Sequence, residues 1–181
     1  MLYVHLNARL RPDDRAGLYE KPLMRYLDAR QPGSQIVGGG TELGADGEPM
    51  SSDIDIELGG DVDAGVTLVR RVLEAVGAPL GSTLTLGTHL VERFGTLHGL
   101  AIYLNGTDLA PEVYSSCDVN EFIDEVVTAL GREGLMQSFW EGPRETALYL
   151  YGPSTETLRE VLAGVLASHP LAQRCRVVDI A

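Results

Sequence analysis

The chain repeats one pattern of strands and helices, and this repeat restricts the possible folds more than any other feature of the sequence. Strand and helix signals follow the order β-α-β-β-α-β in the first half and again in the second half. Residues 101–105 (Ala-Ile-Tyr-Leu-Asn) align with residues 3–7 (Tyr-Val-His-Leu-Asn), and residues 147–152 align with residues 54–59. Similarity at a period of roughly 95 residues indicates two copies of one structural unit.

The order β-α-β-β-α-β is the ferredoxin-like arrangement, in which an antiparallel sheet carries helices on one face. We therefore expect an α+β protein built from two tandem ferredoxin-like units that arose by internal duplication. The expected boundaries are residues 1–89 for the first unit and residues 98–181 for the second, with a linker at residues 90–99. The two copies are expected to pack as one compact body.

Turn and cap signals place the individual elements. Pro32-Gly33 and Gly77 end helices, and Asp46-Gly47 is typical of a hairpin turn. Pro22 is expected in the first turn of its helix, because proline has no backbone N–H to donate farther along. The expected strands are residues 2–8, 34–42, 52–58, 82–86, 101–106, 135–141, 145–151 and 175–180, and the expected helices begin near residues 18, 61, 118 and 154.

The third strand of each copy predicts different surroundings for the two sheets. In the first copy Ile54 and Ile56 alternate with acids, whereas the matching strand of the second copy is apolar on both faces and includes Tyr149 and Tyr151. Successive residues of a strand point to opposite faces of the sheet. We therefore expect the second sheet to be covered on both faces and the first sheet to keep one polar, negative face.

Acidic side chains outnumber basic ones in this chain, 26 to 14, which gives a formal net charge of −12. Nucleic acid and anionic membranes are not expected as partners, because both are bound by basic surfaces. No lysine or arginine occurs between Arg30 and Arg70, and this span contains the candidate partner-binding residues. These are Glu42, Asp46, Glu48, Asp53, Asp55 and Glu57. The pattern favours a basic protein as the partner.

The stretch that contains these acids also resembles a nucleotidyltransferase motif. That superfamily has a Gly-Gly or Gly-Ser turn, followed about a dozen residues later by a strand in which carboxylates alternate with apolar residues. Here Gly39-Gly40-Thr41 precedes Asp53-Ile-Asp55 at such a distance. The resemblance implies that Asp53 and Asp55 would hold Mg²⁺ while the glycine turn binds a triphosphate.

Other catalytic and cofactor signals are missing. The chain has no GxSxG, HExxH, CxxC, GxGxxG or Walker A pattern, so neither a cofactor nor a transition-metal site is expected. His5 and His89 are placed where they could meet Asp53. Cys117 and Cys175 have no metal-ligand spacing, and we expect no signal peptide and no membrane span, which favours a reducing, cytoplasmic location.

Three functional hypotheses follow from the sequence. The favoured one is a non-catalytic, immunity-type inhibitor that neutralises a basic toxin, such as a nuclease, with an acidic surface. The second is a tandem regulatory module that binds a small ligand, as the duplicated βαββαβ units of ACT domains do. The third is an Mg²⁺-dependent nucleotidyltransferase, with Asp53 and Asp55 in reserve as metal ligands. The sequence leaves the oligomeric state open.

Overall fold

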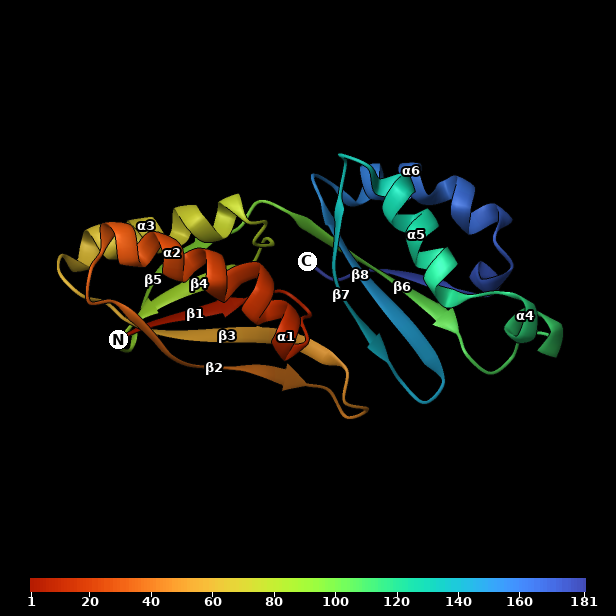
Figure 1. Ribbon diagram of the computed structural model, residues 1–181, viewed down its shortest axis with the longest axis horizontal. Coiled ribbons are helices and arrows are strands. Elements are labelled where there is room, and N and C mark those ends of the chain that lie inside the picture. Colours follow the sequence, from red (N-terminus) through yellow and green to blue (C-terminus); the bar gives the residue numbers. More distant parts are fainter. The chain divides into compact units, whose positions relative to one another are not determined.

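The computed structural model describes residues 1–181 and divides into two compact units, Met1–Leu97 and His98–Ile180. Each unit is an antiparallel sheet that carries its helices on one face, as Figure 1 shows. This is an α+β architecture, and the prediction of two tandem ferredoxin-like units is confirmed by the strand orders described next.

The first unit contains five strands. They are β1 (Leu2–Leu6), β2 (Gln35–Leu43), β3 (Pro49–Glu57), β4 (Ser82–Leu86) and β5 (His89–Phe94). Its helical segments are α1 (Pro12–Arg15), the π-helical turn η1 (Ala16–Glu20), α2 (Lys21–Arg30) and α3 (Val62–Ala75). The strand order across the sheet is β2-β3-β1-β4-β5, so β2 and β5 are its two edges.

The second unit has four strands in the order β7-β8-β6-β9. They are β6 (His98–Asn105), β7 (Leu135–Glu141), β8 (Glu145–Gly152) and β9 (Arg176–Asp179). Its helical segments are α4 (Pro111–Ser116), α5 (Val119–Leu130), α6 (Thr155–Ser168) and the short 3₁₀ turn η2 (Pro170–Ala172). This order matches β2-β3-β1-β4 of the first unit, as expected for a duplicated unit.

Strand β5 occupies part of the predicted linker, so that prediction is wrong over residues 90–94. The strand follows a two-residue turn, since Leu86 of β4 pairs directly with His89. Gly87 in this turn has φ +61°, a conformation that glycine adopts without steric cost. Phe94 at the far end of the strand is buried and anchors it.

The first helix begins at Pro12 rather than near residue 18, and it continues without a break to Arg30. Pro22 lies in the first turn of α2, as predicted, but another helical segment directly precedes that turn. A proline there cannot donate a hydrogen bond to the preceding turn and usually kinks the helix. The chain accommodates it with the π-helical turn just before it, in which the N–H of Lys21 reaches back to the carbonyl of Ala16.

The core of the first unit lies between the sheet and its helices. Alternate residues of β1 and β3 are fully buried, among them Val4 and Ile54. They pack beneath the buried side chains of α2 and α3, such as Leu27 and Leu73. Helix α3 begins where the sequence placed a helix start, and Asp61 rather than Asp63 caps it, because the Asp61 carboxylate accepts a hydrogen bond from the N–H of Ala64.

The second unit is apolar on both faces of its sheet. Leu100, Ile102 and Leu148 face the helices and form one cluster with side chains of α5 and α6. On the other face Tyr149 and Tyr151 are fully buried. The prediction that both faces of this sheet are apolar is therefore confirmed.

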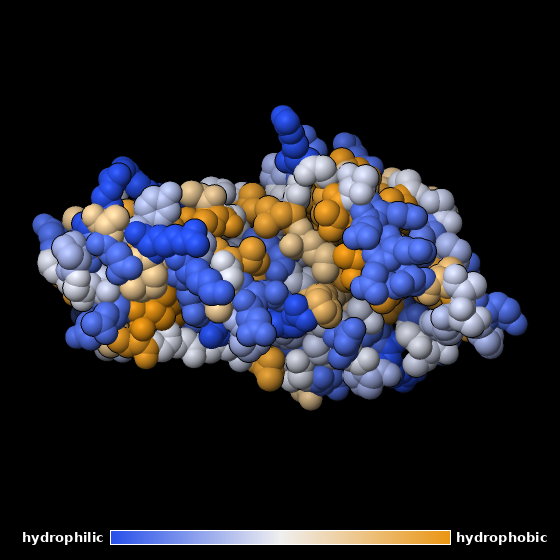
Figure 2. Space-filling view, viewed as in Figure 1, coloured by the Kyte–Doolittle hydropathy of each residue, from blue (hydrophilic) through white to orange (hydrophobic).

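The helices of both units are short. The longest single α-helices, α3 and α6, have 14 residues each, and the longer combined run of α1, η1 and α2 carries charged residues along its length, whereas crossing a bilayer takes about 20 apolar residues. No helix of the chain has the length and apolar character needed for a membrane crossing. The surface seen in Figure 2 mixes hydrophilic and hydrophobic patches.

Candidate functional site

Strand β3 carries the acids that were predicted to bind a partner. Asp53, Asp55 and Glu57 alternate with the fully buried Ile54 and Ile56. Because side chains alternate along a strand, the isoleucines enter the core and the acids lie on the face that carries no helices. Asp53 and Asp55 are half-buried there, and Glu57 is exposed.

The strands on either side of β3 decide what surrounds these acids. On one side Asp53 pairs with His5 of β1, and on the other side it pairs with Gly40 of β2. Asp55 pairs with Tyr3 of β1 and with Gly38 of β2. Directly opposed residues of an antiparallel sheet point to the same face, so each acid lies between a ring and a glycine that offers no side chain.

A shallow hollow of about 390 Å³ marks this part of the sheet. It is lined by Tyr3, Val4, His5, Gly39, Gly40, Asp53, Asp55 and Thr85. All lining residues belong to the first unit, and they come from β1, β2, β3 and β4. The absence of side chains at the glycines contributes to its depth on the β2 side.

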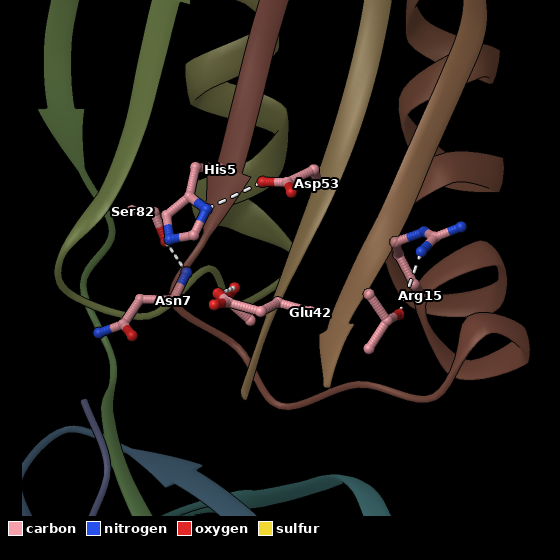
Figure 3. A network of polar contacts seen from close by, with 8 residues as sticks. His5, Asn7, Arg15, Glu42, Asp53 and Ser82 are labelled. Atoms are coloured by element: carbon pink, nitrogen blue, oxygen red, sulfur yellow. Dashed lines mark hydrogen bonds and ion pairs between the residues drawn. The ribbon is translucent and has the colours of Figure 1, made fainter. Parts of the chain in front are cut away.

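His5 and Asp53 make the closest polar contact in the hollow. The Nδ1 atom of His5 lies 2.9 Å from Oδ1 of Asp53. Figure 3 marks this contact with a dashed line. The two side chains are 43% and 49% exposed, so water screens their attraction and the pair contributes little to stability. The hydrogen bond to Asp53 is the one that the His5 side chain makes. No hydroxyl or thiol is bonded to His5 as a catalytic triad would require.

Glu42 lies on the same open face. Its Oε2 atom accepts a hydrogen bond of 2.8 Å from the hydroxyl of Ser51 on β3, which confirms that it points to the side where Asp53 lies. We define the acid face as Glu42, Asp53, Asp55 and Glu57. None of the four is paired with a lysine or arginine.

Two predicted partner-binding residues lie outside the acid face. Glu48 forms an ion pair with Arg9, in which both side chains are largely buried. Its charge is compensated within the chain, so we leave it out of the binding surface. Asp46 is exposed in the hairpin turn between β2 and β3, where Gly47 has φ +78°. That turn was predicted from the sequence.

The arginine that contacts Thr41 of β2 also forms an ion pair within the chain. Arg15 donates from Nε to Glu20 at 2.7 Å and from Nη1 to the Thr41 hydroxyl at 3.2 Å. Figure 3 shows it beside β2, away from the His5–Asp53 contact. The acid face therefore keeps its negative charge uncompensated by neighbouring bases.

The backbone around Gly39 and Asp53 does not have the turn and helix that the nucleotidyltransferase motif requires. Gly38, Gly39 and Gly40 do not form a turn before a helix but lie within β2, paired with β3. The strand then continues through the hairpin into β3, so no helix N-terminus points at the carboxylates. No third ligand joins Asp53 and Asp55, because the chain has no group of three His, Cys, Asp or Glu side chains arranged to hold a metal. His89, on the edge strand β5, does not reach Asp53.

The second unit has a larger cavity of about 560 Å³ that the sequence did not reveal. Its lining combines apolar side chains such as Leu104 and Leu171 with the hydroxyl-bearing residues Tyr114, Ser115 and Thr146. Helix α4, which forms one wall, was not predicted. Cys117 also lines this cavity, whereas Cys175 lies elsewhere in the same unit, where burial raises the pKa of its thiol.

On the face of the second sheet that carries no helices, an acidic side chain has a basic partner. Arg176 makes two hydrogen bonds to the Glu145 carboxylate, of 2.9 and 2.6 Å, and stacks 4.2 Å from the ring of Tyr103. The hydrogen bonds from Arg176 hold the pKa of Glu145 below its usual value. An acid on this sheet is thus neutralised in place, unlike those of the acid face.

No protein-family model and no curated protein matches the chain. Solved structures with a similar arrangement include the regulatory subunit of aspartate kinase from Thermus thermophilus, at 12% identity and a TM-score of 0.29, covering 92% of this chain and 91% of that one. Another is the first two RRM domains of the yeast poly(U)-binding protein, at 8% identity and a TM-score of 0.28, covering 100% and 99%. At such scores the likenesses say nothing about what this chain does.

Proposed function

We propose that this chain is a non-catalytic binding protein whose acid face takes up a basic protein. The observation that supports this most is the uncompensated charge on an open sheet face, where Glu42, Asp55 and Glu57 have no basic partner. Like charges held close together repel each other, and a partner of opposite charge relieves that repulsion.

In its specific form the proposal is an immunity-type inhibitor of a basic toxin such as a nuclease. An acidic surface of this kind occupies the basic groove in which such an enzyme binds nucleic acid. Opposite net charges also accelerate association, because long-range attraction steers the encounter, and this acceleration falls as salt rises. Two free cysteines, Cys117 and Cys175, fit a reducing cytoplasm as the place of action.

Neutralising the acid face should weaken partner binding strongly. We expect the triple variant Glu42→Gln, Asp53→Asn, Asp55→Asn to bind the basic partner about 100-fold more weakly at low salt, because three charge contacts are lost. The partner is obtained by affinity capture from the source organism, and the dissociation constant is then measured by calorimetry at 50 and 200 mM NaCl.

The matched control removes three charges elsewhere. Glu121, Asp124 and Glu125 are exposed on α5 of the second unit, and their triple amide variant changes the net charge equally. We expect it to retain nearly full affinity. Equal losses in both variants, or an affinity indifferent to salt, would contradict a role for the acid face. If the captured protein is a nuclease, its activity should fall in proportion to added wild-type chain.

The cavity of the second unit supports a second candidate, a module that binds a small ligand. Its volume of about 560 Å³ and its mixture of apolar and hydroxyl-bearing lining residues suit a small, weakly charged molecule. A ligand at 100 times its dissociation constant should stabilise the protein by about 2.7 kcal/mol. Thermal unfolding with a panel of amino acids and nucleotides tests this, with Ser115→Tyr as the variant that narrows the cavity and abolishes the shift. An unchanged melting temperature across the panel speaks against it.

A further inference from the structure

Strand β2 is an open edge of the first sheet. It pairs with β3 on one side only, and Figure 1 shows no further strand beyond it in that sheet. Its residues make no backbone–backbone hydrogen bond beyond those to β3. Val37 on this strand is 49% exposed and Leu43 is 59% exposed.

Edge strands are normally protected against pairing with other chains. Lysine, proline and inward-pointing charges are the usual means. The sequence of β2, Gln-Ile-Val-Gly-Gly-Gly-Thr-Glu-Leu, contains neither lysine nor proline. Its register is interrupted twice, by a β-bulge at Val37 and by a shift between Glu42 and Leu43, and it is regular between these two points. The edge is therefore able to accept an additional strand.

The bulge also sets which face the glycines occupy. The register passes from Ile36–Ile56 to Gly38–Asp55, so Val37 is an extra residue in β2. Without this extra residue the facing of Gly38 and Gly40 would be reversed, because one residue of slip turns every side chain to the other face. With it, Gly38 and Gly40 lie on the open face opposite Asp55 and Asp53.

The two glycines leave a side-chain-free path from the acids to the edge. We call Gly38 and Gly40 the glycine trough. A Cβ atom added at Gly40 would meet nothing within 4 Å. A Cβ atom added at Gly38 would lie 2.8 Å from Oδ2 of Asp55, which places that carboxylate above Gly38 and toward the edge.

We propose that the partner adds an extended basic segment to the outer edge of β2, with arginine or lysine at every second position. The proposal rests on the proposed function and specifies how the acid face is reached. Backbone hydrogen bonds would form along residues 35–40, and the basic side chains would pass through the glycine trough to Asp53 and Asp55.

The spacing of strands makes this geometry specific. An added strand would lie two strand spacings, roughly 10 Å, from β3. A long basic side chain bridges that gap to a carboxylate only if the strand between them has no side chain in the way. Arginine suits the position best, since its planar guanidinium binds a carboxylate through two hydrogen bonds. A two-residue repeat of bases matches the two-residue repeat of acids.

Two synthetic peptides test this mode of binding. One has ten residues with arginine at every second position, separated by threonine and valine, and the other has the same composition with its arginines in one block. We expect the alternating peptide to bind at least about tenfold more tightly. Hydrogen exchange should slow at the backbone amides of residues 35–40 in its presence.

The decisive variant is Gly40→Val. It has room for its side chain and favours strand conformation, so the fold is retained, as circular dichroism would show. It should weaken binding of the alternating peptide about tenfold by blocking the glycine trough. Thr83→Val is the control, because Thr83 lies on the same face but on β4, beyond His5, and it should bind normally.

The outcomes separate the two proposals. If the triple acid variant loses partner binding while Gly40→Val keeps it and both peptides bind equally, the acid face is used but docking on β2 is wrong. If neither acid nor glycine variants affect partner binding, the proposed function itself is wrong. A dimer in solution that dissociates in Gly40→Val would show that a second copy occupies the edge, and this too would overturn the proposal.

Discussion

Replacement of Gly39 by alanine is expected to lower the free energy of unfolding of the first unit by about 3 kcal/mol. Gly39 has φ +157°, and a Cβ atom there would lie 2.5 Å from the backbone oxygen of Asp53. That oxygen belongs to the β3 backbone and cannot move aside as a flexible side chain can. The substitution must therefore distort the β2–β3 pairing that positions the acid face.

The neighbouring residue provides the control. Gly40→Ala places its Cβ atom in open space, and its backbone is not in the left-handed region. It should leave stability unchanged or raise it by about 0.5–1 kcal/mol, since alanine loses less backbone entropy than glycine. Urea denaturation followed by circular dichroism measures both variants. Similar stabilities for the two would mean that β2 and β3 pair in a different register.

Much of the fold could be predicted because its signals are local. Alternation of apolar and polar residues located β3, and capping residues such as Asp61 and Ser154 located helix starts, where both accept the expected backbone hydrogen bonds. The first helix has local start signals near Pro12, since Asp13 and Asp14 lie in its first turn, but Pro22 argues against a continuous helix from there. The chain accommodates Pro22 through the π-helical turn that precedes it, and no local sequence pattern indicates such a turn.

Elements that depend on tertiary contacts were also missed. The sequence His89–Phe94 contains two charged residues and no regular alternation, and it becomes β5 because β4 offers an edge and Phe94 enters the core. Helix α4 is short and forms a wall of a cavity, and short helices have weak intrinsic signals. In both cases packing decides the conformation.

The candidate site likewise has features that local sequence patterns predict and features that depend on tertiary contacts. The acids of β3 were placed on one face by their two-residue period alone. The ion pair that removes Glu48 from this surface joins it to Arg9, 39 residues earlier in the chain, and nothing local indicates that contact. The alignment of Gly38 and Gly40 with the acids depends on the bulge at Val37, which shifts the register by one residue. The sequence shows both the glycines and the acids but not that they face each other.

Substitutions on the two faces of β3 should have different effects: those on the buried face should lower stability, and those on the acid face should weaken binding. Ile54→Ala is expected to destabilise the first unit by about 2–5 kcal/mol, because Ile54 is fully buried and its truncation leaves a cavity. Asp55→Asn should change stability by no more than about 0.5 kcal/mol, since the half-buried carboxylate has no ion-pair partner to lose. It should nevertheless weaken binding of a basic partner about tenfold.

The comparison of these adjacent positions tests how the strand combines its two roles. Urea denaturation measures the first effect, and calorimetric titration with the partner or the alternating peptide measures the second. If Asp55→Asn destabilises the unit as much as Ile54→Ala does, the acid has a structural role and the open face is not free for a partner. If Ile54→Ala lowers stability while the surviving folded protein still binds with full affinity, the core residues support the strand and the acids alone make the contact. Ile54 then serves to pack the core on one face of the strand, and its neighbour Asp55 serves to bind a basic partner on the other face.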